Sequence, residues 1–163
     1  GETSTGALHP MQGVGKLCRE FDTLLLLDTV TSLGGAPVFL DRWHVDIAYS
    51  GAQKCLSCPP GISPLTLGER AIDKLNSRKT RVANWYLDMN LVGKYWGNER
   101  TYHHTAPINM IYGLREALRQ LRKGRTEAGG AEVGAAQAPT EILVLFSDGI
   151  DRLRFLGASI RYQ

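Results

Sequence analysis

The sequence has no long apolar run and no strong excess of one charge. No stretch approaches the roughly 20 apolar residues that a membrane-spanning helix needs, and the first residues form neither a signal peptide nor an Arg-rich leader. The formal net charge is only +3, from 19 basic and 16 acidic residues, which does not favour binding to nucleic acid. We therefore expect a soluble chain with no membrane or nucleic-acid partner and no visible targeting signal.

Cysteine is also scarce, because Cys18, Cys55 and Cys58 are its only three copies. So few clustered cysteines do not form a disulfide framework, and a reducing compartment is the simpler expectation. The spacing of Cys55 and Cys58 matches a redox motif or half of a zinc site, but a zinc site needs four ligands and no second cysteine pair exists. We expect no metal here. The favoured interpretation is a tight turn before the Pro-Pro-Gly at 59–61.

The residues that are present favour one α/β domain. With 163 residues, of which 43% are hydrophobic and 21% charged, the chain can bury an ordinary core. Helical and extended spacings alternate along it, and the four leucines at 24–27 are typical of a strand covered on both faces. A mostly parallel sheet between helices is expected. Helices are predicted at 10–21, 69–78 and from 108 onward, and strands at 23–28, 38–40, 46–49, 65–67 and 141–146.

Two residues with the chemistry of a pyridoxal phosphate (PLP) site follow two of these strands. Asp28 ends the leucine run, and Lys54 ends the sequence Ser-Gly-Ala-Gln-Lys at 50–54. Enzymes that use PLP need a lysine amine to hold the cofactor as a Schiff base and a carboxylate to keep its ring nitrogen protonated. Ligands gather at the carboxyl edge of such sheets, which makes both residues candidates. The alternative is that Asp28 turns the chain and Lys54 is a solvated surface lysine.

Longer stretches around these residues resemble the class V aminotransferases. The resemblance covers residues 1 to about 120, and several motifs in the same order are far more specific than any one of them. It implies an α/β fold of the fold-type I PLP-dependent transferases, with this chain holding the core of the large domain, truncated at both ends. The matching segments are 1–6, 26–35, 46–54, 59–61, 77–80, 95–97 and 102–105.

The resemblance also implies which residues bind the cofactor. Lys54 would form the Schiff base and move the proton during transfer, while Asp28 would pair with the ring nitrogen. Gln53 would contact the phosphate, and Val30 would pack its branched side chain against the ring. Thr3 falls on a position that offers a hydroxyl to the cofactor, where the family usually has serine.

A second group of implied contacts lies farther along the chain. Tyr102 and Thr105 match positions that reach the cofactor phosphate from the neighbouring subunit, which implies a homodimer with shared active sites. His103 and His104 lie between them. Adjacent histidines in a strand point to opposite faces, so we do not expect them to share a metal ion.

The resemblance ends near Gln120, and the rest of the chain differs. Residues 124–140 are rich in Gly, Ala, Glu and Gln, which predicts a flexible linker. Residues 141–163 are expected to form a divergent tail of unknown fold, so the PLP-binding part is 1–123. The aromatic-rich segment at 85–96 is more typical of packing or a subunit interface than of a cofactor site.

By resemblance, the expected function is PLP-dependent transfer of an amino group from alanine or serine to glyoxylate or pyruvate, in ping-pong order. The arginine and the stacking aromatic residue that the family uses are not identifiable, so an incomplete, inactive isoform is the alternative. Another class V activity, such as that of a cysteine desulfurase, is a further alternative, although Cys55 lies too close to Lys54 to act as a mobile nucleophile. The resemblance implies peroxisomes or mitochondria as the compartment.

Overall fold

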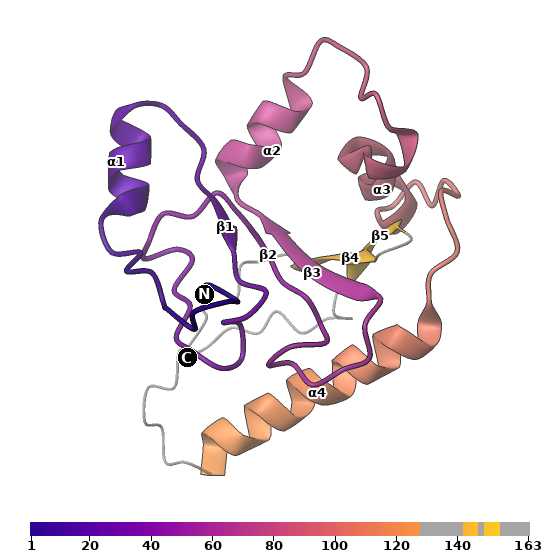
Figure 1. Ribbon diagram of the computed structural model, residues 1–163. Helices are drawn as coiled ribbons and strands as arrows, with labels where there is room; N and C mark the ends of the chain where they lie inside the picture. The colour runs from indigo at the N-terminus through magenta and orange to yellow at the C-terminus, as the bar shows by residue number, and fades with distance from the viewer. Residues whose placement is uncertain (128–141, 147–148, 154–163) are drawn as a thin grey trace.

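The computed structural model describes residues 1–127, 142–146 and 149–153. Its elements in chain order are α1 (Val14–Glu20), β1 (Leu26–Asp28), β2 (Ile47–Tyr49), β3 (Ile62–Leu67), α2 (Glu69–Asn76), the 3-10 helix η1 (Trp85–Leu87), α3 (Met89–Trp96), α4 (Ile108–Glu127), β4 (Ile142–Phe146) and β5 (Gly149–Leu153). The sheet lies in the middle, α1 lies beside β1, and α4 runs along one edge (Figure 1). None of the described helices is long and apolar enough to cross a membrane.

Only one pair of described strands is parallel. The strand order is β1-β2-β3-β4-β5; β1 and β2 are parallel, and the other three pairs are antiparallel. The α/β class is confirmed, while the sheet is mixed instead of mostly parallel. A parallel return needs a crossover, usually a helix, and the segment 50–61 between β2 and β3 contains none. β3 therefore comes back antiparallel to β2.

The run 38–40 forms no strand, which corrects another expectation. The carbonyls of Phe39 and Leu40 instead accept the Trp43 and Val45 N–H groups in the turn that follows, both at 2.9 Å. Val38 and Leu40 are buried instead, where they pack with Ala48 of β2. The remaining predicted helices and strands form, with their bounds shifted by a few residues.

Helix α4 holds the segment that carries Lys54, which we call the lysine loop (residues 50–61). Leu114 of α4 is only 1% exposed, and it packs with Ala52 and Leu56 of the loop. This apolar stripe is the face expected of an amphipathic helix. The partly buried side chains that complete the cluster are Leu33, Cys58, Met110, Ile111, Leu118 and Leu121.

A proline lies at an inner strand beside the lysine loop. Pro64 of β3 has no N–H, but its carbonyl accepts the Ser50 N–H at 2.8 Å. The Ile62 carbonyl accepts the Ala52 N–H at 3.0 Å, and the Ala52 carbonyl in turn accepts the Cys58 N–H at 2.9 Å. The start of the loop is thus attached to β3 through its own N–H groups. The bond from Cys58 to Ala52 then closes the loop on itself.

The described residues after Lys123 belong to one helix and two strands. α4 continues to Glu127 and so includes the start of the predicted linker at 124–140, of which residues 128–140 lie outside the described part. One glycine inside a long helix costs only about 1 kcal/mol relative to alanine, so Gly124 does not end it. The predicted tail at 141–163 contributes β4 and β5, and β4 pairs with β3. The division into domain, linker and tail stays a prediction.

Asp46 joins three parts of the fold through its buried carboxylate. Its Oδ2 accepts the Leu25 N–H at 2.8 Å, and Arg70 of α2 lies 3.2 and 3.1 Å from its two oxygens. Asp46 is 3% exposed, so this pairing is what makes its charge tolerable. Arg70 also contacts Asp22 at 3.2 Å, but Asp22 is fully exposed.

We expect Asp46→Ala to lower the free energy of unfolding by about 3 kcal/mol, because it leaves Arg70 and the Leu25 N–H without their buried partner. Urea denaturation followed by circular dichroism measures the change. Asp22→Asn removes the charge of the exposed partner of the same arginine at a residue with φ of 47°, which asparagine tolerates, and should leave the urea midpoint almost unchanged. Similar losses in both variants would contradict the assignment of the stabilising role to the buried carboxylate.

Candidate functional site

β1 and β2 end at the same edge of the sheet, and hydrogen bonds join the residues that follow them. The Thr29 N–H and hydroxyl both donate to the Tyr49 carbonyl, at 2.9 and 2.7 Å. The Ser50 hydroxyl donates to the Thr29 carbonyl at 3.0 Å, and both Thr29 and Ser50 are buried. The segments that carry Asp28 and Lys54 therefore leave the sheet side by side, at the edge where α/β sheets bind ligands.

The Asp28 carboxylate accepts a hydrogen bond at each oxygen. The Val30 N–H donates to Oδ1 at 2.8 Å, and the Tyr49 hydroxyl donates to Oδ2 at 2.6 Å. These bonds fix the orientation of the carboxylate, and each oxygen retains a lone pair for a further donor. The hydrogen bond to Asp28 raises the pKa of the Tyr49 phenol, and burial and the carboxylate charge add to this effect.

Tyr49 is a site residue that the sequence pattern did not single out. The strand register places Tyr49 directly beside Asp28 on the parallel neighbour. Paired residues present their side chains on the same face of a sheet, which lets the phenol reach the carboxylate. Aligning the two predicted strands at their carboxyl ends is the signal that would have identified it.

Lys54 lies on the exposed side of the lysine loop. Ala52 and Leu56 are buried beneath it, whereas Lys54 and Cys55 face outward. The Cys55 thiol donates to the Thr31 carbonyl at 3.3 Å. This contact ties the lysine loop to the segment that follows β1, so the loop has one anchor on α4 and another beside the aspartate.

Gln53 and Val30 meet at Gly51. A Cβ built on Gly51 would lie 2.8 Å from the Gln53 Oε1 and 3.3 Å from a methyl carbon of Val30. A larger residue at position 51 would require the Gln53 side chain to move and would crowd Val30. The structure thus brings together two of the predicted cofactor contacts.

Thr3 lies in a tight turn at the start of the chain. The Gly6 N–H donates to the Glu2 carbonyl at 2.9 Å, and the Thr31 hydroxyl donates to the Gly1 carbonyl at 2.8 Å. The turn is therefore tied to the same segment that follows β1, and the Thr3 side chain is exposed.

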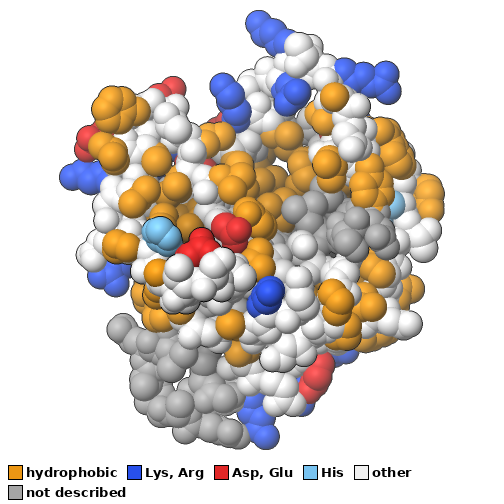
Figure 2. Space-filling view, in the orientation of Figure 1, with side chains coloured by type: hydrophobic (Ala, Val, Ile, Leu, Met, Phe, Trp, Pro, Cys, Tyr) orange, Lys and Arg blue, Asp and Glu red, His pale blue; other side chains and the backbone are white. Residues whose placement is uncertain are grey.

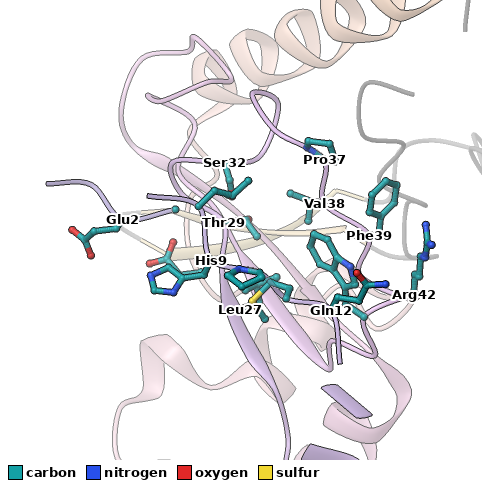
Figure 3. Close-up of a pocket in the computed structure, with 16 residues that line it drawn as sticks. Glu2, His9, Gln12, Leu27, Thr29, Ser32, Pro37, Val38, Phe39 and Arg42 are labelled. Atoms are coloured by element: carbon teal, nitrogen blue, oxygen red, sulfur yellow. The ribbon is translucent and has the colours of Figure 1, made fainter. Parts of the chain in front are cut away.

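A cavity of about 590 Å³ opens beside the end of β1, where Asp28 lines it. Figure 3 shows Glu2 and His9 on one side of this cavity and Phe39 and Arg42 on the other. In Figure 2, acidic side chains and a histidine lie beside hydrophobic ones near the middle of the visible face, while Lys and Arg side chains gather at the upper rim. The predicted cofactor residues that do not line the cavity are Thr3, Val30, Gln53, Lys54, Tyr102 and Thr105.

Tyr102 and Thr105 are brought together, with 2.8 Å between Oη and Oγ1, and both side chains are exposed. Between them, His103 and His104 are both buried, with 2.7 Å between their Nδ1 atoms. The expectation that these histidines point to opposite faces is wrong, because the 102–105 segment is not a strand. Among the described residues, no group of three or more His, Cys, Asp or Glu side chains could hold a metal ion.

The chemistry of these side chains fits PLP. Asp28 offers an oriented carboxylate for a ring nitrogen, and Lys54 offers a primary amine on the neighbouring loop. Gln53, Tyr102 and Thr105 offer neutral donors, which suit a phosphate. The Val30 side chain, two residues after Asp28, lies close to the loop backbone at Gly51.

Comparison with known proteins points to one family. The profile of the family described as Aminotransferase class-V matches residues 1–150. The alanine–glyoxylate aminotransferase of Oryctolagus cuniculus is 45% identical over 124 residues, which cover 74% of this chain and 32% of that protein. The (S)-ureidoglycine–glyoxylate transaminase of Bacillus subtilis is 37% identical over 137 residues, which cover 73% and 33%. The chain therefore spans about a third of the length of these curated relatives.

Solved structures give the same result. The alanine–glyoxylate aminotransferase from Nostoc sp. superposes with a TM-score of 0.72 at 55% identity, covering 91% of this chain and 45% of that one. The ureidoglycine–glyoxylate aminotransferase from Bacillus subtilis has a TM-score of 0.75 at 39% identity, covering 80% and 34%. With the family profile matched over residues 1–150 and Asp28 and Lys54 leaving one edge of the sheet, the chain belongs to the class V aminotransferase family.

Proposed function

We propose that this chain binds PLP through Lys54 and takes part in the transfer of an amino group from alanine or serine to glyoxylate or pyruvate. The observation that carries the proposal is the shared edge of β1 and β2. There, two hydrogen bonds orient the Asp28 carboxylate, and the lysine loop is tied to the neighbouring segment. The names of the relatives, alanine–glyoxylate aminotransferase among them, support alanine and glyoxylate, whereas serine and pyruvate rest on the family resemblance.

The positions of Lys54 and Asp28 support distinct roles. When bound, PLP supplies an electron sink for reactions at the α-carbon of an amino acid. Lys54 would hold it through Nζ and, when the substrate amine takes its place, would carry a proton at that atom. An exposed position on a loop leaves the amine room for both tasks. Asp28 would accept a hydrogen bond from the ring N–H, in the orientation that Val30 and Tyr49 fix.

The remaining residues would bind and position the cofactor. The Gln53 amide would donate to its phosphate, Val30 would pack against its ring, and the Thr3 hydroxyl would be a further donor. Tyr102 is 71% exposed and, with Thr105, presents a pair of hydroxyl groups outward. These two would reach the phosphate held by a neighbouring subunit, which makes the proposed active form a homodimer.

Transfer would run as two half-reactions in ping-pong order, because the amino group must be stored on the enzyme between donor and acceptor. Peroxisomes or mitochondria are the compartments that the family resemblance supports for this activity. A second candidate is a chain that binds the cofactor but does not turn over, because the arginine and the stacking aromatic residue that the family uses are not identifiable in its sequence. A cysteine desulfurase activity receives less support. The solved cysteine desulfurase from Thermococcus onnurineus is only 19% identical to this chain, which shows a shared fold alone.

Lys54→Ala should abolish the visible absorbance band that forms when the purified chain is incubated with PLP, because the band requires the lysine amine. Lys74→Ala removes an exposed lysine on α2 and should leave the band intact. Turnover of alanine and glyoxylate, followed by coupling pyruvate to lactate dehydrogenase, distinguishes the transaminase from the non-catalytic chain. A band of equal size in the Lys54→Ala variant would overturn the proposal.

Tyr49→Phe should weaken PLP binding about tenfold, which is the effect expected from loss of a hydrogen bond to a charged group. The variant keeps the ring but leaves the Asp28 Oδ2 without the donor that orients it. Titration of the same absorbance band gives the dissociation constant. Tyr112→Phe removes an exposed hydroxyl on α4 and serves as the matched control. Unchanged affinity in Tyr49→Phe would show that the phenol does not orient the carboxylate.

A further inference from the structure

Two buried histidines separate the two exposed hydroxyl side chains of the 102–105 segment. His103 is 4% exposed and His104 7%, whereas Tyr102 and Thr105 are exposed. The two imidazole rings are nearly perpendicular, at 88°, and their Nδ1 atoms are 2.7 Å apart. Neither histidine has a part in the proposed function so far.

The partners of His103 determine where the protons lie. Its Nε2 is 3.1 Å from the Trp85 carbonyl oxygen, which can only accept, so Nε2 carries a hydrogen. In the neutral pair, the His103 Nδ1 is then an acceptor and the His104 Nδ1 is the donor. Burial, together with the proximity of His103, lowers the pKa of His104, which favours this neutral arrangement. With both rings neutral, this pattern places the two hydrogens on different atoms, Nε2 of His103 and Nδ1 of His104.

Ring contacts connect this pair to the exposed hydroxyl side chains. The Trp85 ring of η1 stacks on His103, with 4.1 Å between centroids. The Tyr95 ring of α3 lies 5.0 Å from His104 and 5.9 Å from the Tyr102 ring. The Tyr95 ring therefore contacts both Tyr102 and His104. The Tyr102 hydroxyl in turn lies 2.8 Å from the Thr105 hydroxyl.

We infer that His103 and His104 are positioning residues for a phosphate-binding site: their buried hydrogen bond fixes the short segment that presents the Tyr102 and Thr105 hydroxyls. This inference rests on the proposed function, in which these hydroxyls bind the phosphate of PLP. Among the described residues, no strand pairs with this segment to hold its backbone. The bond between the two imidazoles, with the contact to the Trp85 carbonyl, supplies the fixed point that a strand would otherwise give.

The test compares PLP with pyridoxal, which has the same aldehyde and ring but no phosphate. His103→Phe should raise the dissociation constant for PLP about tenfold, as expected for losing a hydrogen bond to an anion, and leave that for pyridoxal unchanged. Tyr102→Phe and Thr105→Val should show the same selectivity. An equal loss of affinity for both ligands in His103→Phe would mean a general structural role and would overturn the inference.

A second variant at the same position separates hydrogen bonding from packing. His103→Phe keeps a flat ring against Trp85 but no acceptor, whereas His103→Asn loses the ring but places an amide oxygen near the former Nδ1. We expect Asn to bind PLP more tightly than Phe. The reverse order would show that the ring only fills space. His44→Asn, at an exposed residue with φ of 55° that asparagine tolerates, is the control for loss of a histidine.

A measurement without any cofactor distinguishes failure of this inference from failure of the proposed function. ¹⁵N NMR of the imidazole rings at neutral pH should show His103 protonated at Nε2 and His104 at Nδ1. The Thr105 methyl signal should shift in His103→Phe and stay in place in His44→Asn. If neither ligand forms a Lys54-dependent band, the proposed function fails, and the NMR result alone decides the positioning role. Two rings that are both protonated at Nε2 would overturn the inference.

Discussion

The hydrogen bonds from Thr29 to the Tyr49 carbonyl are the interaction on which the rest of the site depends. They continue the pairing of β1 and β2 beyond the last strand residues, and burial of Thr29 shields them from water. Because of this pairing, the Tyr49 hydroxyl reaches Asp28, and the lysine loop begins beside the segment that follows β1. A site made of two loops thereby acquires the rigidity of a sheet.

Residues with no chemical role determine where the amine of Lys54 lies. Leu114 of α4 is 60 positions away in the sequence, yet it packs beneath Ala52 and Leu56, on either side of the lysine. The loop cannot shift without opening this cluster to water, which costs roughly 25 cal/mol for each Å² of apolar surface exposed. α4 thus holds the lysine loop in place, while Asp28 follows the neighbouring strand.

Much of this arrangement follows from the sequence, and the exceptions have physical causes. The leucine run before Asp28 and the amphipathic spacing of α4 predict elements that form. The expectation that the leucine strand is covered on both faces is wrong for the described residues, because Leu26 is 56% exposed. The return direction of β3 leaves no such pattern in the sequence, since it depends on what the 50–61 segment does in space. Two further contacts could not be predicted from the sequence. The contact of Tyr49 with Asp28 depends on the strand register, and the contact of His103 with His104 depends on how the rings are placed by folding.

Pro64 lies where the aligned part of β2 and β3 ends and the lysine loop begins. At Pro64 the pairing between β3 and the chain after β2 keeps the bond from the Ser50 N–H but lacks the N–H that another residue would offer, and it continues with the bond from the Ala52 N–H to the Ile62 carbonyl. Because Pro64 has no N–H to return, that pairing is weakened where Ser50 begins the loop, while the register of β2 and β3 is already set by Ile47 to Tyr49. Substitutions at the exposed loop positions 53–55 can therefore leave both the register of the sheet and the buried cluster intact, so the chemistry of the loop can change while its support stays the same.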